Sequence, residues 1–210
     1  MEWRGLFVAK HPDVYEPSDD TFLLAEAVAD AVAAWPTPRP RFLEVGCGAG
    51  LVSLAAAKEG ARVTATDLNP HAVELATHNG KQNGHPLDVR HGDLLEPAAD
   101  AGPFDLVAFN PPYLPTAEDE KVTGPLNLAF DGGPDGNETV LRFAAQLARL
   151  PAPLPTQVLV IHSSLSDPAP LEAALAKLGY QSEVEREKAF FYERLRVLRF
   201  TRSARVGLDA

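Results

Sequence analysis

Short apolar runs alternate with longer amphipathic segments along most of this chain. The short runs have the length and composition of buried strands, and the longer segments repeat apolar residues every three or four positions, as helices do. The expected strands are residues 41–45, 61–67, 86–93, 104–110 and 156–164. The expected helices are residues 17–35, 51–60, 70–84, 138–150 and 167–179. This alternation predicts an α/β fold with a mainly parallel sheet and helices on both faces.

Two further extended runs, residues 180–188 and 193–202, close the chain and are expected to form an antiparallel hairpin. The complete sheet is therefore expected to have seven strands. A length of 210 residues suits a single domain over residues 1–210, with residues 1–16 as an N-terminal extension. No repeat and no Gly/Ser linker divides the sequence.

The charge of the chain bears on its partners. The formal net charge is −10, from 29 acidic and 19 basic residues. A nucleic-acid-binding protein usually has a basic surface, because neutralised phosphates supply much of the affinity. The basic concentration at residues 194–205 alternates arginines with apolar residues, and we expect it to be the polar face of an edge strand. The composition thus disfavours a nucleic-acid partner.

Other features of the sequence bear on its compartment. The most apolar helical segment is interrupted by acidic residues, and the N-terminus lacks the apolar core of a signal peptide. The single cysteine, Cys47, excludes an intramolecular disulfide and a cysteine-rich metal site. We therefore expect a cytoplasmic protein without a membrane span and without a metal.

A glycine-rich turn, EVGCGAG at residues 44–50, follows the first expected strand. Gly46, Gly48 and Gly50 allow the backbone to turn tightly and to approach a ligand closely. The spacing differs from the dinucleotide-binding fingerprint, whose third glycine would fall at Leu51, and the chain has no phosphate-binding loop of the Walker type. The turn alone is weak evidence for a nucleoside ligand.

Acidic residues follow the second and third expected strands. Asp67 could accept hydrogen bonds from both hydroxyls of a ribose, or it could simply cap the following helix. Leu68 follows it and is placed with the ligand-binding residues. After the third strand, Asp93 could meet an exocyclic amine and Leu94 could cover the face of an adenine. Together with the glycine turn, these positions predict a nucleoside site at the strand ends.

The fourth expected strand runs into FNPPYLP, residues 109–115, which is too rich in proline for a helix or a central strand. The Asn110 side-chain oxygen and the Pro111 carbonyl could accept hydrogen bonds from the two N–H groups of a planar amine or amide. Pro112 stiffens this stretch, which we call the proline corner. Tyr113 could lie flat against the same group. These residues are expected to bind the acceptor, and Asn110, Pro111 and Tyr113 to be catalytic.

These motifs, in this order, resemble those of class I S-adenosylmethionine-dependent methyltransferases, and within that class the HemK family, which methylates glutamine side chains. The matching residues are Glu44, Gly46, Gly48, Gly50, Asp67, Asp93, Asn110, Pro111, Pro112 and Tyr113. The resemblance implies a Rossmann-like methyltransferase fold and S-adenosylmethionine as the cofactor. It also places Glu44 and Asn110 among the cofactor-binding residues.

Two further segments carry the resemblance. Residues 14–24, with Tyr15, Asp20 and Thr21, are similar to the segment of the family that closes over the methionine end of the cofactor. Residues 130–138 are similar to its glycine-rich stretch after the Asn-Pro-Pro-Tyr corner.

The resemblance also bears on the substrate. Little sequence precedes the match, so the chain looks like the short archaeal and eukaryotic branch of the family. That branch implies the glutamine of the Gly-Gly-Gln loop of a peptide-chain release factor as substrate. It also implies recognition by the core, by a substrate-side loop at residues 115–136 or by a small activating partner subunit.

Two alternatives stay open. The corner suits any planar amine, so the chain could methylate the amino group of a nucleobase such as adenine N6 or guanine N2. It could also be a cofactor-binding subunit without catalysis, although such subunits usually lose the acceptor corner.

Overall fold

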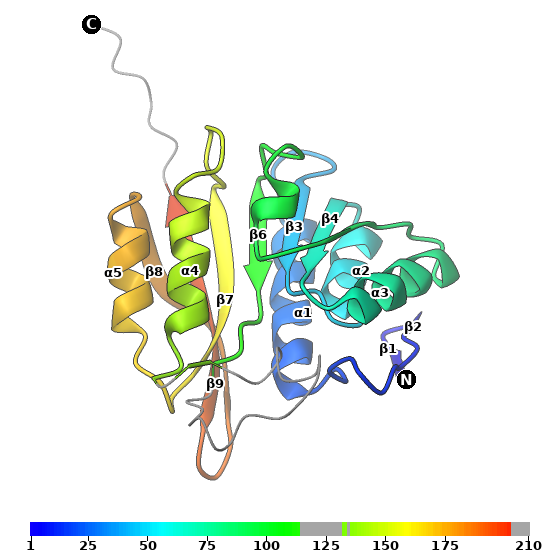
Figure 1. Cartoon of the computed structure of the whole chain (residues 1–210), viewed down its shortest axis with the longest axis horizontal. Coiled ribbons are helices and arrows are strands. Elements are labelled where there is room, and N and C mark those ends of the chain that lie inside the picture. The colour runs from blue at the N-terminus through cyan, green and yellow to red at the C-terminus, as the bar shows by residue number, and fades with distance from the viewer. Residues whose placement is uncertain (114–131, 134, 203–210) are drawn as a thin grey trace, which may run out of the picture.

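The computed structural model describes residues 1–113, 132–133 and 135–202. Its central feature is a seven-stranded sheet in the order β5-β4-β3-β6-β7-β9-β8, which confirms the predicted fold class (Figure 1). Neighbouring strands from β5 to β7 are parallel, and β9 is antiparallel to both β7 and β8. The strands are β3 (Arg41–Val45), β4 (Arg62–Asp67), β5 (Asp88–His91), β6 (Leu106–Phe109), β7 (Gln157–Ser163), β8 (Tyr180–Ala189) and β9 (Arg194–Arg202).

Helices cover both faces of this sheet. They are α1 (Asp19–Ala33), α2 (Leu51–Lys58), α3 (Pro70–Gln82), α4 (Glu138–Leu147) and α5 (Ala169–Ala176), with a short 3-10 turn, η1 (Glu96–Ala98). Successive strand residues point to opposite faces, so Phe42 packs with α1 and α2 while its neighbour Leu43 packs with α4 and α5. Both side chains are fully buried. Burying a side chain of this size stabilises the fold by about 1.5–3 kcal/mol.

The arginine-rich run near the C-terminus does not lie at the sheet edge, contrary to the prediction. It forms β9, which is paired on both sides, and β8 is the edge strand. The glutamates of β8 stand beside the arginines of β9, and Glu187 pairs with both Arg194 and Arg196. Most of the described arginines of this run are therefore paired with acids.

The first residues form a hairpin of β1 (Glu2–Trp3) and β2 (Leu6–Phe7), where the sequence predicted only an extension. Leu6 is buried in the core beneath it. Two asparagines of the α3 end hold the segment: the amide of Asn79 accepts from the Ala9 N–H, and that of Asn83 accepts from the Phe7 N–H. Asn79 also donates to the Ala49 carbonyl at 2.9 Å, which ties this segment to the glycine turn.

The predicted substrate-side loop falls largely outside the described residues, since positions 114–131 and 134 are not among them. Within the described part of the chain, no helix has the length and apolar character needed to cross a membrane.

Candidate active site

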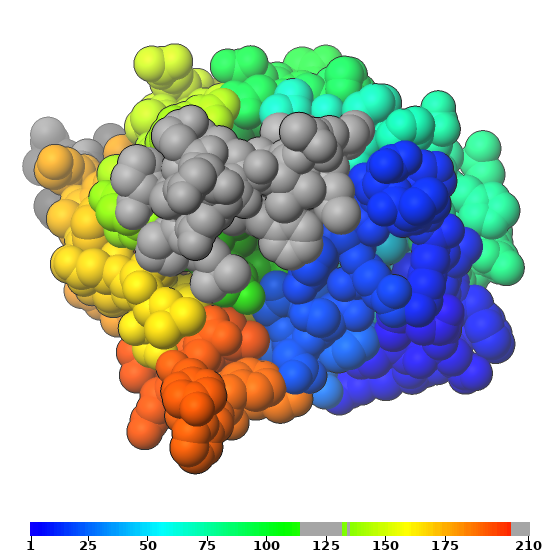
Figure 2. All heavy atoms as spheres, turned by 60° about the horizontal axis from the view of Figure 1, so that its bottom comes forward, coloured from blue at the N-terminus to red at the C-terminus, as the bar shows by residue number. Residues whose placement is uncertain are grey.

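The predicted site residues meet at one edge of the sheet. β5, β4, β3 and β6 are neighbours and parallel, so the segments that follow them lie side by side where these strands end. We call this the carboxyl edge; it is the lower edge in Figure 1 and turns toward the viewer in Figure 2. Open α/β sheets bind their ligands at such an edge.

The glycine turn has two kinds of glycine. Gly50 begins α2 with a φ of 82°, and a Cβ there would lie 2.9 Å from the Ala76 Cβ of α3, so the residue permits close helix packing. Gly48 has a φ of 52°, and among the described residues nothing lies within 4 Å of a Cβ built on it. Its backbone therefore faces open space, as a turn that lies against a ligand requires.

Asp67 is held in place by backbone donors from two segments. The Gly48 N–H donates to Oδ2 at 2.8 Å, and the Asn69 N–H donates to Oδ1 at 2.8 Å. Burial raises the pKa of this carboxyl group. Asn69, not Asp67, caps α3, because its side chain accepts from the His71 N–H at 3.0 Å. Each Asp67 oxygen has a second acceptor position, so the carboxylate can still receive the two hydroxyls of a ribose.

Glu44 lies beneath the turn. Its side chain is 3% exposed and accepts from both the N–H and the hydroxyl of Ser53 on α2. Burial raises the pKa of Glu44 to about 8. These bonds fasten the end of β3 to α2; a direct contact of Glu44 with a cofactor stays a prediction.

Asp93, after β5, has partners that the local sequence does not reveal. The Arg142 guanidinium donates to its two oxygens at 2.7 and 2.6 Å, and the Gln146 amide donates to Oδ2 at 2.9 Å. Both partners lie on α4, one helical turn apart. Their i, i+4 spacing indicates that the two side chains lie on one face of the helix. It does not indicate that Asp93 lies opposite them.

The leucines beside the two aspartates differ in their surroundings. Leu94 has a left-handed backbone, with a φ of 47°, and its carbonyl accepts the Thr66 hydroxyl at 2.6 Å. Its side chain is partly buried against the cluster that includes Phe109. Leu68 is 43% exposed at the carboxyl edge, so an apolar partner could still cover it.

The proline corner follows β6. Among the described residues, the side-chain oxygen of Asn110 is buried and has no hydrogen-bond partner. An unpaired buried acceptor costs about 1–3 kcal/mol, which a ligand that donates to it would recover. The corner is also tightly packed, because a Cβ on Gly136 would lie 2.4 Å from the Tyr113 carbonyl oxygen. Gly136 therefore supports the backbone of the corner, a role that only the three-dimensional structure reveals.

Asp20 is the centre of a polar cluster at the start of α1. Its side chain is 4% exposed, and it accepts from the hydroxyls of Tyr15 and Ser18 and from the Thr21 N–H. The Tyr113 hydroxyl also donates to it. Burial, followed by the charge of Asp20, raises the pKa of Tyr113. The structure thus brings the predicted residues of the N-terminal segment against the proline corner; Ser18 was not predicted.

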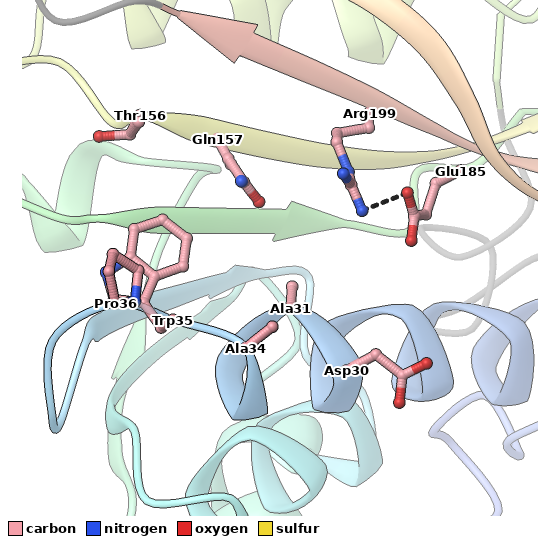
Figure 3. A pocket seen from close by; sticks show the side chains of 9 residues that line it. All are labelled: Asp30, Ala31, Ala34, Trp35, Pro36, Thr156, Gln157, Glu185 and Arg199. Atoms are coloured by element: carbon pink, nitrogen blue, oxygen red, sulfur yellow. Dashed lines mark ion pairs between the residues drawn. The ribbon is translucent and has the colours of Figure 1, made fainter.

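Two observations bear on other ligands. Within the described residues, no group of three or more His, Cys, Asp or Glu side chains could hold a metal ion. A pocket of about 360 Å³ lies at the end of α1 and the start of β7 (Figure 3). The ion pair between Arg199 and Glu185 lines it, as do Trp35 and Gln157. It is separate from the strand-end site.

Comparison with known proteins shows the family of this chain. Residues 8–125 match the family model of the methyltransferase small domain. MJ0928 of Methanocaldococcus jannaschii, provisionally assigned as a protein N5-glutamine methyltransferase, is 38% identical over 94% of this chain and 96% of its own length. Methyltransferase HEMK2 of Mus musculus is 34% identical over 95% of this chain and 93% of its own length. The chain belongs to the HemK family of methyltransferases.

Relatives of this HemK-family chain differ in length. The release factor glutamine methyltransferase of Deinococcus radiodurans is 34% identical over 88% of this chain, which spans 66% of that protein. A solved chain from the E. cuniculi Mtq2–Trm112 complex, responsible for methylation of the translation termination factor eRF1, superposes with a TM-score of 0.69. It is 23% identical, with 91% of this chain and 99% of that chain covered, and it supports the methyltransferase fold.

Proposed function

We propose that this enzyme transfers a methyl group from S-adenosylmethionine to the side-chain amide nitrogen of a glutamine, in the Gly-Gly-Gln loop of a peptide-chain release factor. The observation that carries the proposal is the buried side-chain oxygen of Asn110 at the carboxyl edge, which has no hydrogen-bond partner among the described residues. Such an acceptor fits an amide N–H, which is the group that an N-methyltransferase of this family has to hold.

An amide nitrogen is a weak nucleophile because its lone pair is delocalised, and the proline corner can make it more reactive. The Asn110 oxygen and the Pro111 carbonyl can accept hydrogen bonds from the two N–H groups of the amide. These bonds favour a pyramidal nitrogen, whose lone pair points away from the two oxygens. When bound, S-adenosylmethionine supplies a methyl group on a positively charged sulfur that leaves with its electron pair. The nitrogen lone pair forms the new N–C bond, and the nitrogen then releases a proton to water. Catalysis here is positioning by preorganised dipoles, and the step needs no strong base.

The residues fit the cofactor in chemical terms. Gly48 offers open backbone, and Asp67 retains one acceptor position on each oxygen for the ribose hydroxyls. Asp93 offers a carboxylate to the exocyclic amine of adenine, beside Leu94, and Arg142 and Gln146 hold that carboxylate in place. The cluster around Asp20 would lie toward the methionine end, as the resemblance implies.

The choice of acceptor rests on the relatives and on charge. Curated relatives bear the names of protein N5-glutamine and release factor glutamine methyltransferases. A net charge of −10 disfavours a polynucleotide, and Arg194, Arg196 and Arg199 of β9 each pair with a glutamate. We also propose that a small partner subunit stimulates the activity, by analogy with the Mtq2–Trm112 complex.

The test is a methylation assay with methyl-labelled cofactor and purified release factor from the same organism, its loop glutamine intact or replaced by alanine. Mass spectrometry should find one added methyl on the glutamine, and the alanine form should stay unlabelled. Total RNA is offered in a parallel reaction. Equal labelling of both release factors, or label in RNA alone, would contradict the glutamine assignment and leave a methyltransferase with another acceptor.

A further inference from the structure

The turn between β8 and β9 carries two aromatic side chains that the fold does not cover. Phe191 is 89% exposed and Tyr192 is 85% exposed, and their rings meet edge to face with centroids 4.5 Å apart. Phe190 is 39% exposed and lies beneath the Lys188 ammonium, 5.4 Å from the ring centroid. We call residues 190–192 the aromatic tip. Contiguous exposed apolar side chains of this kind mark interaction sites more often than isolated ones do.

The strand pairing places the aromatic tip at the carboxyl edge. β9 is antiparallel to β7, and Leu195 near its start stands opposite Ser163 at the end of β7. The turn that precedes β9 therefore projects beyond the point where β7 ends, on the same side as the proline corner. Figure 1 shows the hairpin extending past the lower edge of the sheet, and Figure 2 shows it standing out from that face of the molecule.

Polar contacts fix the hairpin against the site. The Lys188 ammonium pairs with Asp19 of α1 at 2.8 Å, one residue before Asp20, to which the Tyr113 hydroxyl donates. On the other arm, Glu193 accepts the Ser163 hydroxyl at 2.6 Å, and its charge contributes to the raised pKa of Tyr113. These contacts attach both arms of the hairpin to elements of the carboxyl edge.

We propose that the aromatic tip is a docking surface for the protein that carries the acceptor glutamine. This inference rests on the proposed function. A protein that inserts a loop at Asn110 has to lie over the carboxyl edge, from which the aromatic tip projects. The proline corner can contact only the amide itself, so affinity for a whole protein has to come from contacts around it. Aromatic side chains that become buried on binding are typical sources of such affinity.

The test compares the wild-type enzyme with the double variant Phe191→Ser/Tyr192→Ser on two acceptors. With intact release factor, the double variant should raise KM by about tenfold or more and leave kcat within about twofold. With a synthetic Gly-Gly-Gln peptide and in cofactor titrations, both enzymes should behave alike. Phe7→Ser, which replaces a 54% exposed aromatic residue of β2, is the matched control and should change none of these values.

Three results would overturn the inference. Unchanged KM for release factor would show that the aromatic tip does not contact it. An equal loss with peptide and protein would mean that the hairpin acts on the reaction site itself. A change of oligomeric state, or loss of a co-purified subunit with unchanged release-factor KM, would assign the aromatic tip to another partner. If the wild-type enzyme methylates neither acceptor, the proposed function fails first and the docking inference falls with it.

Discussion

The hydroxyl of Tyr113, at the end of the proline corner, donates a hydrogen bond of 3.3 Å to the Asp20 carboxylate, 93 positions earlier in the chain. The bond joins the segment after β6 to the first turn of α1. It holds the Tyr113 hydroxyl against Asp20, and burial with the charge of Asp20 raises the pKa of Tyr113, so the hydroxyl stays protonated as a donor.

Removing this hydroxyl should slow methyl transfer. A hydrogen bond to a charged acceptor contributes about 1.5–3 kcal/mol, so Tyr113→Phe should lower kcat about tenfold or more while the ring still packs. Steady-state kinetics measure this effect. Tyr180→Phe is the control, since it removes a hydroxyl that donates to the Pro155 carbonyl at 2.7 Å, away from the site. Equal kcat for wild type and Tyr113→Phe would show that the bond to Asp20 does not position the ring.

Truncating Asn110 should separate catalysis from cofactor binding. Loss of a preorganised group at the reacting centre typically costs about 10²–10³ in kcat, so Asn110→Ala should lose most activity and keep its cofactor affinity. Asn110→Asp retains an oxygen acceptor and should keep partial activity. Calorimetry with the cofactor and single-turnover assays measure the two quantities. If Asn110→Ala loses cofactor binding as well, the residue belongs to the cofactor site or supports the loop.

Asp67→Ala should weaken cofactor binding by about tenfold or more for each ribose hydrogen bond lost, because each such bond to a charged acceptor contributes about 1.5–3 kcal/mol. The Gly48 N–H also loses its partner, so thermal stability has to be recorded beside the calorimetric Kd. His71→Ala is the control: it changes a side chain in the first turn of α3 and leaves both the Asn69 cap and the backbone donors of Asp67 in place, so the Kd should stay unchanged. A folded Asp67→Ala protein with wild-type affinity would remove Asp67 from the site.

Gly136→Ala should disturb the proline corner. The added methyl group would meet the Tyr113 carbonyl, and the φ of 73° is strained for alanine. Gly84→Ala shares the strain, with a φ of 72°, but among the described residues it meets nothing within 4 Å. The difference between the two variants in Tm and in kcat therefore isolates the close contact. Equal losses in both would show that backbone strain alone matters at Gly136.

Glu44 should make the fold less stable as the pH rises. Its folded pKa of about 8 exceeds the ordinary value of 4.5, so the stabilising contribution is complete below the unfolded pKa and is lost as the pH rises through the folded one. Glu44→Gln should flatten the decline by up to about 1.4 kcal/mol per pH unit between these values. Denaturant titrations at several pH values measure it, with Glu59→Gln at the exposed end of α2 as control. Parallel curves for wild type and Glu44→Gln would contradict the assignment.

The sequence by itself determined the strands of the main sheet, the five helices and their order, but not the N-terminal hairpin. Local signals indicate well where a helix begins. Asn69 caps α3 and Pro70 is its first residue, as predicted, because a cap and a proline act within a few residues of the helix start. The alternation of strands and helices then implied a parallel sheet, and the residues after each strand could be assigned to one edge. The family motifs lie in those segments, so the sequence alone indicates the candidate site.

Only the tertiary structure decided which distant residues complete the site. Strand pairing placed β9 inside the sheet, because its partner β7 lies far back in the chain and no local pattern distinguishes an edge from an interior strand. Packing likewise brought Arg142 to Asp93, Gly136 to Tyr113, and the aromatic tip to the carboxyl edge. A periodic pattern records which face of an element is buried, but it carries no information on which residue of another element lies opposite.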